Sequence, residues 1–252
     1  MTIIRRLCPP VRAWILAFAG IGLAAPGVAG PPFVSDDPEP TEQGHWEIYG
    51  FTGGSYVPGE TDGAAGFDIN YGGAKDLQLT AVLPINFQTG TDGAVGLGNI
   101  ELAAKYKFLH QSKGTLIPDV AFFPRAFVPT AGRRFGTRRL SVLLPLWAQK
   151  DFGKWSLFGG GGYDINPGPG QRNFWLTGIG AQRAISDRFS LGAEVYRQTA
   201  DADDARRFTA LNIGALYRLS EHWSLIGSAG PGIEHARTQG RYVFYAALKA
   251  DY

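Results

Sequence analysis

The sequence is almost free of sulfur and has no long apolar run in its main part. Among 252 residues there are one cysteine, Cys8, and one methionine, Met1. A single cysteine excludes an intrachain disulfide framework and the paired-cysteine zinc motifs. After the first thirty positions no stretch approaches the roughly 18 consecutive apolar residues of a transmembrane helix. The fold must therefore be held by something other than disulfides or membrane helices.

The first thirty residues have the layout of a secretory signal peptide. Arg5, Arg6 and Arg12 form a basic head, and the apolar run "AWILAFAGIGLAA" covers residues 13–25. Small residues follow in "PGVAG", and the run is too short to span a membrane as a helix. We predict a cleaved signal peptide at residues 1–29; the alternative is a buried N-terminal helix. Cys8 precedes the apolar run, so it cannot be the lipid-carrying cysteine of a lipoprotein.

An excess of charge of one sign is also missing once this leader is removed. Residues 1–29 carry three arginines and no acid, so 24 Lys and Arg fall to 21 against 22 Asp and Glu, a charge of −1. The pI of 8.6 describes the precursor only, and a nucleic-acid partner has no support. The 35 glycines and the 13% aromatic residues favour one all-β domain.

Apolar and polar residues alternate with a period of two along most of the chain. Twelve such stretches follow one another: residues 44–55, 64–73, 76–88, 97–110, 117–129, 138–151, 154–166, 172–185, 188–200, 206–219, 222–235 and 241–252. Most are close to the length that a tilted strand needs to cross the hydrocarbon layer. Alternation also describes the strands of a soluble sandwich, so other features must decide where the apolar face points.

The connections between these stretches favour a membrane barrel. The tight connections "GAKD", "QKDFGK", "ISDR" and "LSEH" alternate with mostly longer ones such as "PGETDGAA" and "PTAGRRFGTR". Outer-membrane barrels show this alternation of periplasmic turns and external loops, although "HQSKGTLIP" is longer than the pattern predicts. No predicted external loop exceeds about ten residues, so no loop is expected to constrict the lumen.

Aromatic residues gather at both ends of the predicted strands, as they do at the boundaries of a membrane. The alternative is aromatic packing in a core. The set at the tight-turn end is Trp46, Phe108, Phe152, Trp155, Phe189, Tyr217, Trp223 and Tyr252, and the set at the other rim is Trp175, Phe208 and Tyr242.

The C-terminal stretch "RYVFYAALKADY" alternates strictly and ends on an aromatic residue, Tyr252. An open sheet in lipid would leave backbone groups unpaired, so the last strand is expected to pair with the first. This stretch resembles the signal read by the outer-membrane barrel assembly machinery. Tyr252 is therefore predicted to anchor the closing strand, and that machinery is an expected partner.

These features together predict an all-β fold: a transmembrane, antiparallel, up-and-down β-barrel of about 12 strands, integral to the bacterial outer membrane. Outer-membrane lipid and lipopolysaccharide are its expected surroundings. The barrel is predicted at residues 45–252. The Pro-rich, acidic residues 30–44 come before it as a periplasmic segment, which is either a loose linker or a stopper for the periplasmic mouth.

Several stretches resemble a known family. They include "GPPFVSDDPEPTEQGHWEIY" (30–49), "LPLWAQKDFGKWSLFGGGGYDINPGPGQRNFWLTGI" (144–179), "DINYG" (68–72), "LQLTAVLP" (77–84) and "SAGPGIEHA" (228–236). Together they are similar to a family of bacterial outer-membrane transporters labelled "MetA-pathway of phenol degradation". The resemblance covers essentially the whole mature chain. It implies an outer-membrane barrel associated with aromatic-compound metabolism, and it supplies no catalytic residue.

The sequence offers little to catalysis. The histidines His45, His110, His222 and His235 are predicted at strand ends or turns, well apart, and no cofactor-binding or metal-binding motif occurs. A membrane-embedded lipid hydrolase needs a serine beside a histidine on the outer wall. Ser220 and His222 are close in sequence but share one tight turn. We therefore expect no enzyme, cofactor or metal.

The polar residues of the inward-facing positions are the candidate functional residues. The predicted lumen lining is Glu47, Asp68, Asn70, Gln78, Glu101, Lys105, Lys107, Arg125, Asp164, Gln182, Glu194, Tyr196, Asn212, Arg218, Tyr245 and Lys249, with Gln149 and Asp251 on the same face. Their charges nearly cancel, whereas a strongly ion-selective pore would show one sign. One hypothesis is a passive channel for small organic solutes, with aromatic compounds as a candidate class. The other is a non-conducting structural barrel closed by ion pairs such as Glu101 with Lys105.

Overall fold

The computed structural model describes residues 32–91, 93–136, 138–234 and 240–252; the predicted signal peptide and His235 lie outside the described residues. In the described part of the chain the regular elements are β1 (Trp46–Val57), β2 (Glu60–Ala74), β3 (Leu77–Gln88), β4 (Ala94–Leu97), β5 (Ile100–Leu109), β6 (Asp119–Phe122), β7 (Arg125–Val128), β8 (Ser141–Phe152), β9 (Trp155–Ile165), β10 (Phe174–Ser186), β11 (Phe189–Gln198), β12 (Phe208–Arg218), β13 (Trp223–Pro231) and β14 (Tyr242–Asp251). No helix within these ranges is long and apolar enough to cross a bilayer.

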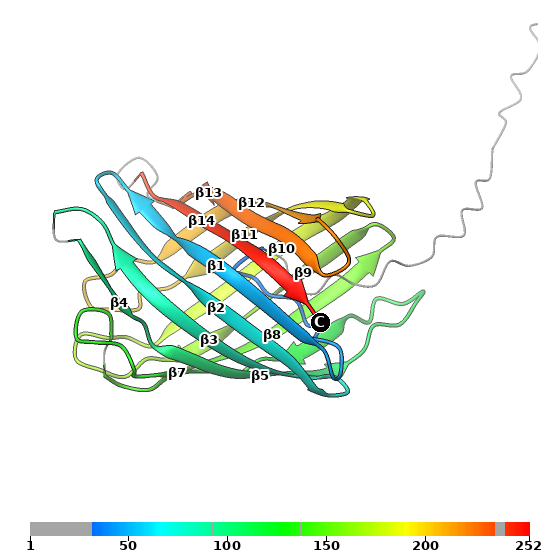
Figure 1. Cartoon of the computed structure of the whole chain (residues 1–252), viewed down its shortest axis with the longest axis horizontal. Coiled ribbons are helices and arrows are strands. Elements are labelled where there is room, and N and C mark those ends of the chain that lie inside the picture. Colours follow the sequence, from blue (N-terminus) through cyan, green and yellow to red (C-terminus); the bar gives the residue numbers. More distant parts are fainter. Residues whose placement is uncertain (1–31, 92, 137, 235–239) are drawn as a thin grey trace, which may run out of the picture.

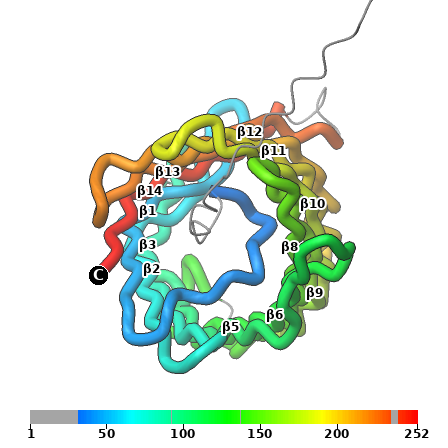
Figure 2. The backbone as a smooth tube through the Cα atoms, turned by 90° about the vertical axis from the view of Figure 1, so that its right-hand side faces the viewer, coloured from blue at the N-terminus to red at the C-terminus, as the bar shows by residue number. Residues whose placement is uncertain are grey.

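The strands form one antiparallel sheet that closes on itself (Figures 1 and 2). Apart from two interrupted strands, each strand pairs with its neighbours in the chain. The ring closes where β1 pairs with β14, from Glu47 opposite Asp251 to Tyr56 opposite Tyr242. Trp46 and Tyr252 exchange backbone hydrogen bonds of 2.7 and 2.9 Å at the end of this seam. The predicted closure of the last strand on the first is therefore confirmed.

Two barrel strands are interrupted, which is why fourteen segments make twelve positions in the ring. β4 and β5 both pair with β3 and are separated at Gly98 and Asn99. β6 and β7 both lie between β5 and β8 and are separated at Phe123 and Pro124. Pro124 has no amide hydrogen to donate to a ladder, although its carbonyl still accepts from the Ala104 amide at 3.2 Å. The prediction of about 12 strands is confirmed.

The apolar side chains of the strands point outward and the charged ones inward. On β5, Leu102, Tyr106 and Phe108 are 50%, 53% and 51% exposed, whereas Lys105 between them is 3% exposed. In a soluble sandwich this burial pattern would be reversed. The outward direction of the apolar face is the arrangement that a membrane barrel requires, and the prediction is confirmed.

The two ends of the barrel differ in their connections. The terminal end carries Trp46, Tyr252 and the connections 75–76, 110–118, 153–154, 187–188 and 219–222; the loop end carries 58–59, 89–93, 129–140, 166–173, 199–207 and 232–241. The predicted loop "PGETDGAA" is wrong, because β2 begins at Glu60 and only Pro58 and Gly59 form the turn. Gly59 has a φ of +91°, which suits glycine in so short a turn.

Two further expectations about the loop end are wrong. The connection 129–140 has twelve residues between Val128 and Ser141, and its Phe135 lines both cavities of the lumen, so an external loop does narrow the interior. Phe208, expected in the aromatic rim, packs inside the barrel against a buried apolar cluster. Its even position on β12 is that of the buried Asn212, which explains its direction.

Candidate functional site in the barrel lumen

The sequence-predicted lumen residues differ in burial. Most are buried: Asn70, Gln78, Glu101, Lys105, Lys107, Asp164, Glu194, Tyr196, Asn212 and Lys249. The others are half-buried: Glu47, Asp68, Arg125, Gln182, Arg218 and Tyr245. Buried lysines and glutamates are rare unless they are paired, so the partners of these groups indicate how the lumen is organised.

The N-terminal residues 32–44 lie inside the ring of strands (Figure 2). This stretch, called the luminal segment below, begins with "PFVSDDPEP" and has no regular secondary structure beyond an isolated bridge of Gln43 with Gly72. Prolines have no backbone N–H to donate, and they disfavour both an α-helix and pairing in a β-sheet. Its polar backbone groups must therefore find partners on the barrel wall, since buried polar groups without partners are costly.

Glu194 of β11 holds the first part of the luminal segment. Its two carboxylate oxygens accept hydrogen bonds from the amides of Val34 at 2.9 Å and Ser35 at 2.8 Å, and a third from Nδ2 of Asn212 at 2.8 Å. Glu194 as a whole is 1% exposed. Hydrogen bonds to a charged acceptor are about twice as strong as neutral ones, so Glu194 satisfies backbone donors that the strands cannot reach.

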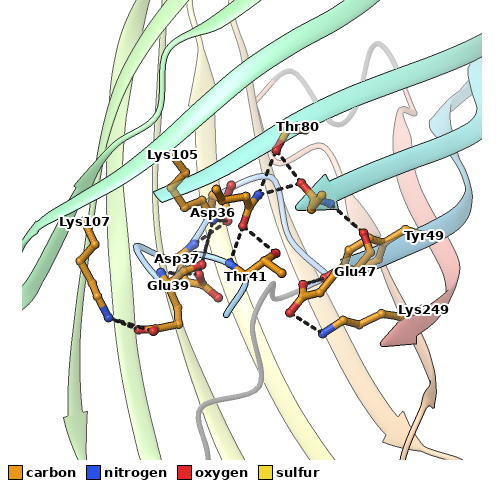
Figure 3. A network of polar contacts seen from close by, with 12 residues as sticks. Asp36, Asp37, Glu39, Thr41, Glu47, Tyr49, Thr80, Lys105, Lys107 and Lys249 are labelled. Carbon is orange, nitrogen blue, oxygen red and sulfur yellow. Dashed lines mark hydrogen bonds and ion pairs between the residues drawn. The ribbon is translucent and has the colours of Figure 1, made fainter. Parts of the chain in front are cut away.

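Two lysines of β5 hold the acidic middle of the luminal segment (Figure 3). Lys105 Nζ lies 3.1 Å from Asp36 Oδ1 and 3.6 Å from Asp37 Oδ1, and Lys107 Nζ lies 2.7 Å from Glu39 Oε2. The expected pair of Glu101 with Lys105 is therefore wrong. Lys105 turns to the luminal segment, and Glu101 pairs with Arg125 of β7 instead.

A chain of amide and hydroxyl groups continues the contact to the end of the luminal segment (Figure 3). Gln78 Oε1 accepts from the Thr41 amide at 2.8 Å and from the Thr41 hydroxyl at 3.0 Å. Gln78 Nε2 donates in turn to Asn70 Oδ1 at 2.7 Å, and Asn70 Nδ2 donates to Asp68 Oδ1 at 2.9 Å. Such a fully connected network orients its members more firmly than isolated pairs do.

The closing seam contributes a separate ion-pair group to the same end of the lumen. Lys249 Nζ of β14 lies 3.2 Å from Glu47 Oε1 and 2.8 Å from Asp251 Oδ1. The Tyr49 hydroxyl donates to Glu47 Oε2 at 2.9 Å. These contacts tie β1 to β14 on the inside, next to the backbone bonds of Tyr252. At the same end, His222 Nδ1 lies 2.9 Å from the Asp251 carbonyl oxygen, and its ring stacks on Tyr252.

Three glycines on neighbouring strands make room for the luminal segment. A Cβ at Gly178 of β10 would lie 2.0 Å from Ser35 Oγ, and a Cβ at Gly214 of β12 would lie 2.5 Å from the Phe33 ring. Gly192 of β11 between them would bring its Cβ to 3.1 Å from that ring. Sequence reasoning missed this cradle; glycine at inward positions of three successive strands was the available signal.

Large apolar residues also face inward, which the sequence analysis did not consider. Phe33 stacks on Phe158 of β9 with ring centroids 5.5 Å apart. Buried apolar side chains on the inner face include Tyr49, Leu143, Trp147, Phe158, Leu176, Leu216 and Ile226. Their sequence parity is that of the charged lumen residues, so the period of two could have located them.

Two cavities occupy the lumen toward the loop end. The first, of about 600 Å³, has residues of the luminal segment on one side and aromatic residues around it. Its inward-facing aromatic residues include Phe33, Phe135, Tyr196, Phe208 and Tyr245. The second, of about 410 Å³, is lined by Phe51, Phe127, Phe135 and Tyr245 together with Asp68, Glu101 and Arg125. Cavities of these volumes suit small organic molecules.

Arg125 is the main cation of the second cavity. Its Nε and Nη2 donate to the two oxygens of Glu101 at 2.6 and 2.8 Å, a bidentate pair. The guanidinium carbon lies 5.7 Å from the Phe123 ring and 5.8 Å from the Phe127 ring. Arg125 is therefore held by a carboxylate and two aromatic faces, and Asp68 is the other carboxylate of this cavity.

Glu234, in the connection 232–241 at the loop end, forms a separate clamp. Its carboxylate accepts from the Thr209 hydroxyl at 2.8 Å and lies 3.0 Å from Arg197 Nη1 and 2.5 Å from Arg207 Nε. The hydrogen bond from Thr209, with those from the arginines, lowers the pKa of Glu234 below its usual value. The Glu234 carboxylate is therefore ionised at neutral pH and can pair with both arginines.

The described histidines do not form a common site. His110 Nε2 lies 2.9 Å from Asp76 Oδ1 at the terminal end, and the His222 amide donates to Ser220 Oγ at 3.3 Å. Ser220 and His222 therefore both lie in the tight connection 219–222 and not on the outer surface of the strands. Over the described residues no group of three or more His, Cys, Asp or Glu is placed to hold a metal ion.

A closed antiparallel ring with apolar side chains outside and charged side chains inside defines the class of outer-membrane β-barrels. A family model described as "Putative MetA-pathway of phenol degradation" matches residues 48–245. The chain belongs to this family, as its resemblance predicted.

A solved structure shows the same fold. An outer membrane channel from Pseudomonas putida F1 superimposes with a TM-score of 0.65 at 14% identity, covering 90% of this chain and 99% of that one. The outer membrane channel DcaP of Acinetobacter baumannii gives a TM-score of 0.36 at 9% identity, covering 89% of this chain and 100% of that one. No curated protein matched the sequence significantly.

Proposed function

We propose that the protein is a passive outer-membrane channel for small organic solutes, with aromatic compounds among them. The observation that carries this proposal is the pair of aromatic-lined cavities, about 600 and 410 Å³, inside the closed ring. A barrel that served only as a scaffold would have no need to keep such volumes unfilled, because close packing stabilises an interior. The family name and the Pseudomonas channel support the same function.

The charges of the cavities favour neutral or zwitterionic solutes. The first cavity has Asp62 and Arg241 among its lining residues, and the second has Asp68 and Glu101 with Arg125. Strongly ion-selective pores are built from rings of one sign. The cavities instead combine near-balanced charges with aromatic walls, which suits a small ring carrying one or two polar groups.

The luminal segment is proposed to restrict passage at the terminal end. Its anchors are Glu194, Lys105, Lys107 and Gln78, all on the barrel wall and all buried. By the usual orientation of outer-membrane barrels this end faces the periplasm. A solute entering from outside would meet the aromatic cavities first and the luminal segment second, so the segment would limit the rate and size of passage.

Planar-bilayer recording of the purified, refolded protein tests the channel. We expect small, steady conductance steps and faster swelling of liposomes in small uncharged solutes than in sugars that exceed the cavity volumes. A membrane that stays sealed at all voltages, together with liposomes that do not swell, would contradict the proposal.

A non-conducting structural barrel is the second candidate, and the buried ion pairs favour it. Asp37 and Lys105 have side chains only 4% exposed each, an arrangement that suits a permanent plug. If this candidate is correct, neutralising Lys105 lowers the thermal stability and leaves the membrane sealed. The channel predicts instead that the same change raises conductance.

Assembly and surroundings complete the proposal. We infer export through the signal peptide at residues 1–29 and recognition of β14 by the barrel assembly machinery, with outer-membrane lipid and lipopolysaccharide around the wall. The backbone pairing of Tyr252 with Trp46 supports a closing role for this residue. Replacing Tyr252 by Ser should lower the amount of assembled barrel in cells, while the refolded protein keeps its conductance.

A further inference from the structure

Phe135 is the residue that the two lumen cavities share from a loop. It lies in the connection 129–140, whereas the other residues that line both cavities, Asn86 and Tyr245, belong to the wall. Both cavities lie toward the loop end, and this ring borders each of them. The position of Phe135 therefore affects both volumes.

The connection that carries Phe135 is pinned to the barrel by hydrogen bonds. The Ala131 amide donates to Asn99 Oδ1 at 3.1 Å, and the Thr130 hydroxyl donates to the Gly98 carbonyl at 3.1 Å. Arg134 Nη2 donates to Gln88 Oε1 at 2.7 Å. Gly98 and Asn99 lie at the interruption between β4 and β5, and Gln88 ends β3. These contacts therefore hold the connection 129–140 against these strands at the loop end of the barrel.

The backbone around Phe135 is fixed as well. The Phe135 amide donates to the Gly132 carbonyl at 3.1 Å, and the Gly136 amide donates to the same carbonyl at 3.0 Å. A carbonyl shared by two amides makes a tight turn, and this turn fixes the backbone position from which the ring extends. Asn99, which accepts from Ala131, also lines the second cavity.

Gly96 of β4 gives the ring its place against the wall. A Cβ at this position would lie 3.2 Å from Phe135 Cδ2 and 3.3 Å from Cε2. The neighbouring Leu97 points outward and is 67% exposed. Glycine at position 96 thus lets the ring lie closer to the strand than any other residue would allow, and a larger residue would push it into the cavities.

We propose that Phe135 is the solute-selecting residue at the loop end. This inference rests on the proposed channel function. The ring borders cavities whose inward-facing aromatic residues include Phe51, Phe127 and Tyr245, so an aromatic solute exchanges one ring contact for another as it passes. A saturated solute of the same size meets the same obstruction without the stacking contact. Phe135 thereby both narrows the path and favours aromatic solutes.

Single-channel recording with a matched pair of probes tests the role of Phe135. Benzyl alcohol and cyclohexylmethanol have nearly the same size, but only the first has an aromatic ring. In the wild type we expect benzyl alcohol to interrupt the current for longer than cyclohexylmethanol. Phe135→Ala should raise the conductance and shorten the benzyl alcohol interruptions about two- to tenfold, as expected for the loss of one aromatic contact.

Three further variants separate stacking from simple obstruction. Phe135→Leu keeps most of the apolar volume without the ring, so it should remove the preference for benzyl alcohol while changing the conductance less than Phe135→Ala. Gly96→Val should push the ring inward and lower the conductance. Leu97→Ala, on the same strand but facing outward, should behave as the wild type.

The outcomes distinguish this inference from the channel itself. A wild-type protein that does not conduct overturns the channel, and the role of Phe135 with it. A conducting wild type whose conductance and probe preference are unchanged by Phe135→Ala overturns the role of Phe135 alone. Equal interruption by both probes in the wild type also overturns it.

Discussion

The two halves of the lumen use the same inner wall for opposite purposes. Toward the terminal end, Lys105 and Lys107 form ion pairs with the luminal segment, and Glu194 in the middle of β11 binds its backbone amides. Toward the loop end, aromatic side chains border cavities of about 600 and 410 Å³. The comparison shows that polar lining residues in a barrel need not line a water path. Here they hold an internal segment, and the unfilled volume lies among aromatic rings.

The difference follows from what each kind of side chain can do inside a barrel. Lysine and glutamate buried in a lumen need partners, and the luminal segment supplies them. Aromatic rings need no partner beyond contact, and rigid rings with few rotamers can border a cavity without collapsing into it. A filled half and an open half can therefore coexist on one sheet.

Removing the luminal segment should produce the largest effect. Deletion of residues 32–41 takes away the partners of Glu194, Lys105 and Gln78 and opens the terminal half of the lumen to water. The diameter of a barrel grows with its strand number, and twelve strands exceed the eight whose side chains just fill the interior, so we expect the single-channel conductance to rise severalfold. Leu116→Ser, in the exposed connection 110–118 at the same end, is the control and should leave it unchanged.

Filling the glycine cradle should produce the next largest effect. Valine at Gly214 would place side-chain atoms where the Phe33 ring lies, since even a Cβ there comes within 2.5 Å. The wall cannot move without breaking the ladder, so the luminal segment should leave, and conductance should approach that of the deletion. Gly50→Ala is the matched control, because the nearest atom to its Cβ would be a Phe67 side-chain carbon at 3.8 Å.

Neutralising the two lysines should have graded effects. Lys105 pairs with Asp36 and Asp37, whereas Lys107 pairs with Glu39, whose side chain is 39% exposed. Breaking a buried pair costs about 3–5 kcal/mol, and an exposed pair is worth far less. Lys105→Met should therefore expose the luminal segment to a Glu-specific protease, which can cleave the bond between Glu42 and Gln43 but not the one between Glu39 and Pro40, faster than Lys107→Met does. Equal cleavage in both variants would contradict this order.

Removing the positive charge from the second cavity, in the loop-end half of the lumen, should have the smallest effect on conductance. The second cavity has two carboxylates, Asp68 and Glu101, and one guanidinium, Arg125. Arg125→Gln leaves both carboxylates without that cation, so the reversal potential in a salt gradient should shift toward cations, with little change in conductance. Arg188→Gln, in the turn 187–188 at the terminal end, is the control. A shift toward anions, or none, would show that Arg125 does not face the path.

The sequence predicted the barrel better than it predicted the contents of the lumen. A period of two fixes which face of a strand each residue occupies, so Glu101, Lys105 and Glu194 could be placed without a structure. The alternation of connections and the aromatic C-terminus indicated how the ring closes. These inferences depend only on neighbours along one strand, which the sequence displays directly.

Contacts between distant parts of the chain could not be predicted in the same way. Lys105 and Asp36 are far apart in sequence, and the residues around each give no indication that the two would form a pair. The expected pair of Lys105 with Glu101 was therefore wrong. The luminal segment was left open between a linker and a stopper for the same reason. Phe135 was missed because loop length was judged from strand boundaries, and the connection 129–140 is longer than those boundaries implied.

The most direct test of the account is the reactivity of a thiol placed in the luminal segment. The only cysteine, Cys8, lies in the predicted signal peptide, so a cysteine introduced into the mature chain has no competitor. Ser35 is fully buried and lies against Gly178 of β10, and Ser35→Cys leaves that glycine in place. In the folded protein in detergent this thiol should resist a water-soluble thiol reagent and react only after denaturation. If it instead reacts readily in the folded protein, the luminal segment does not lie against β10 and the division of the lumen into a filled and an open half is wrong.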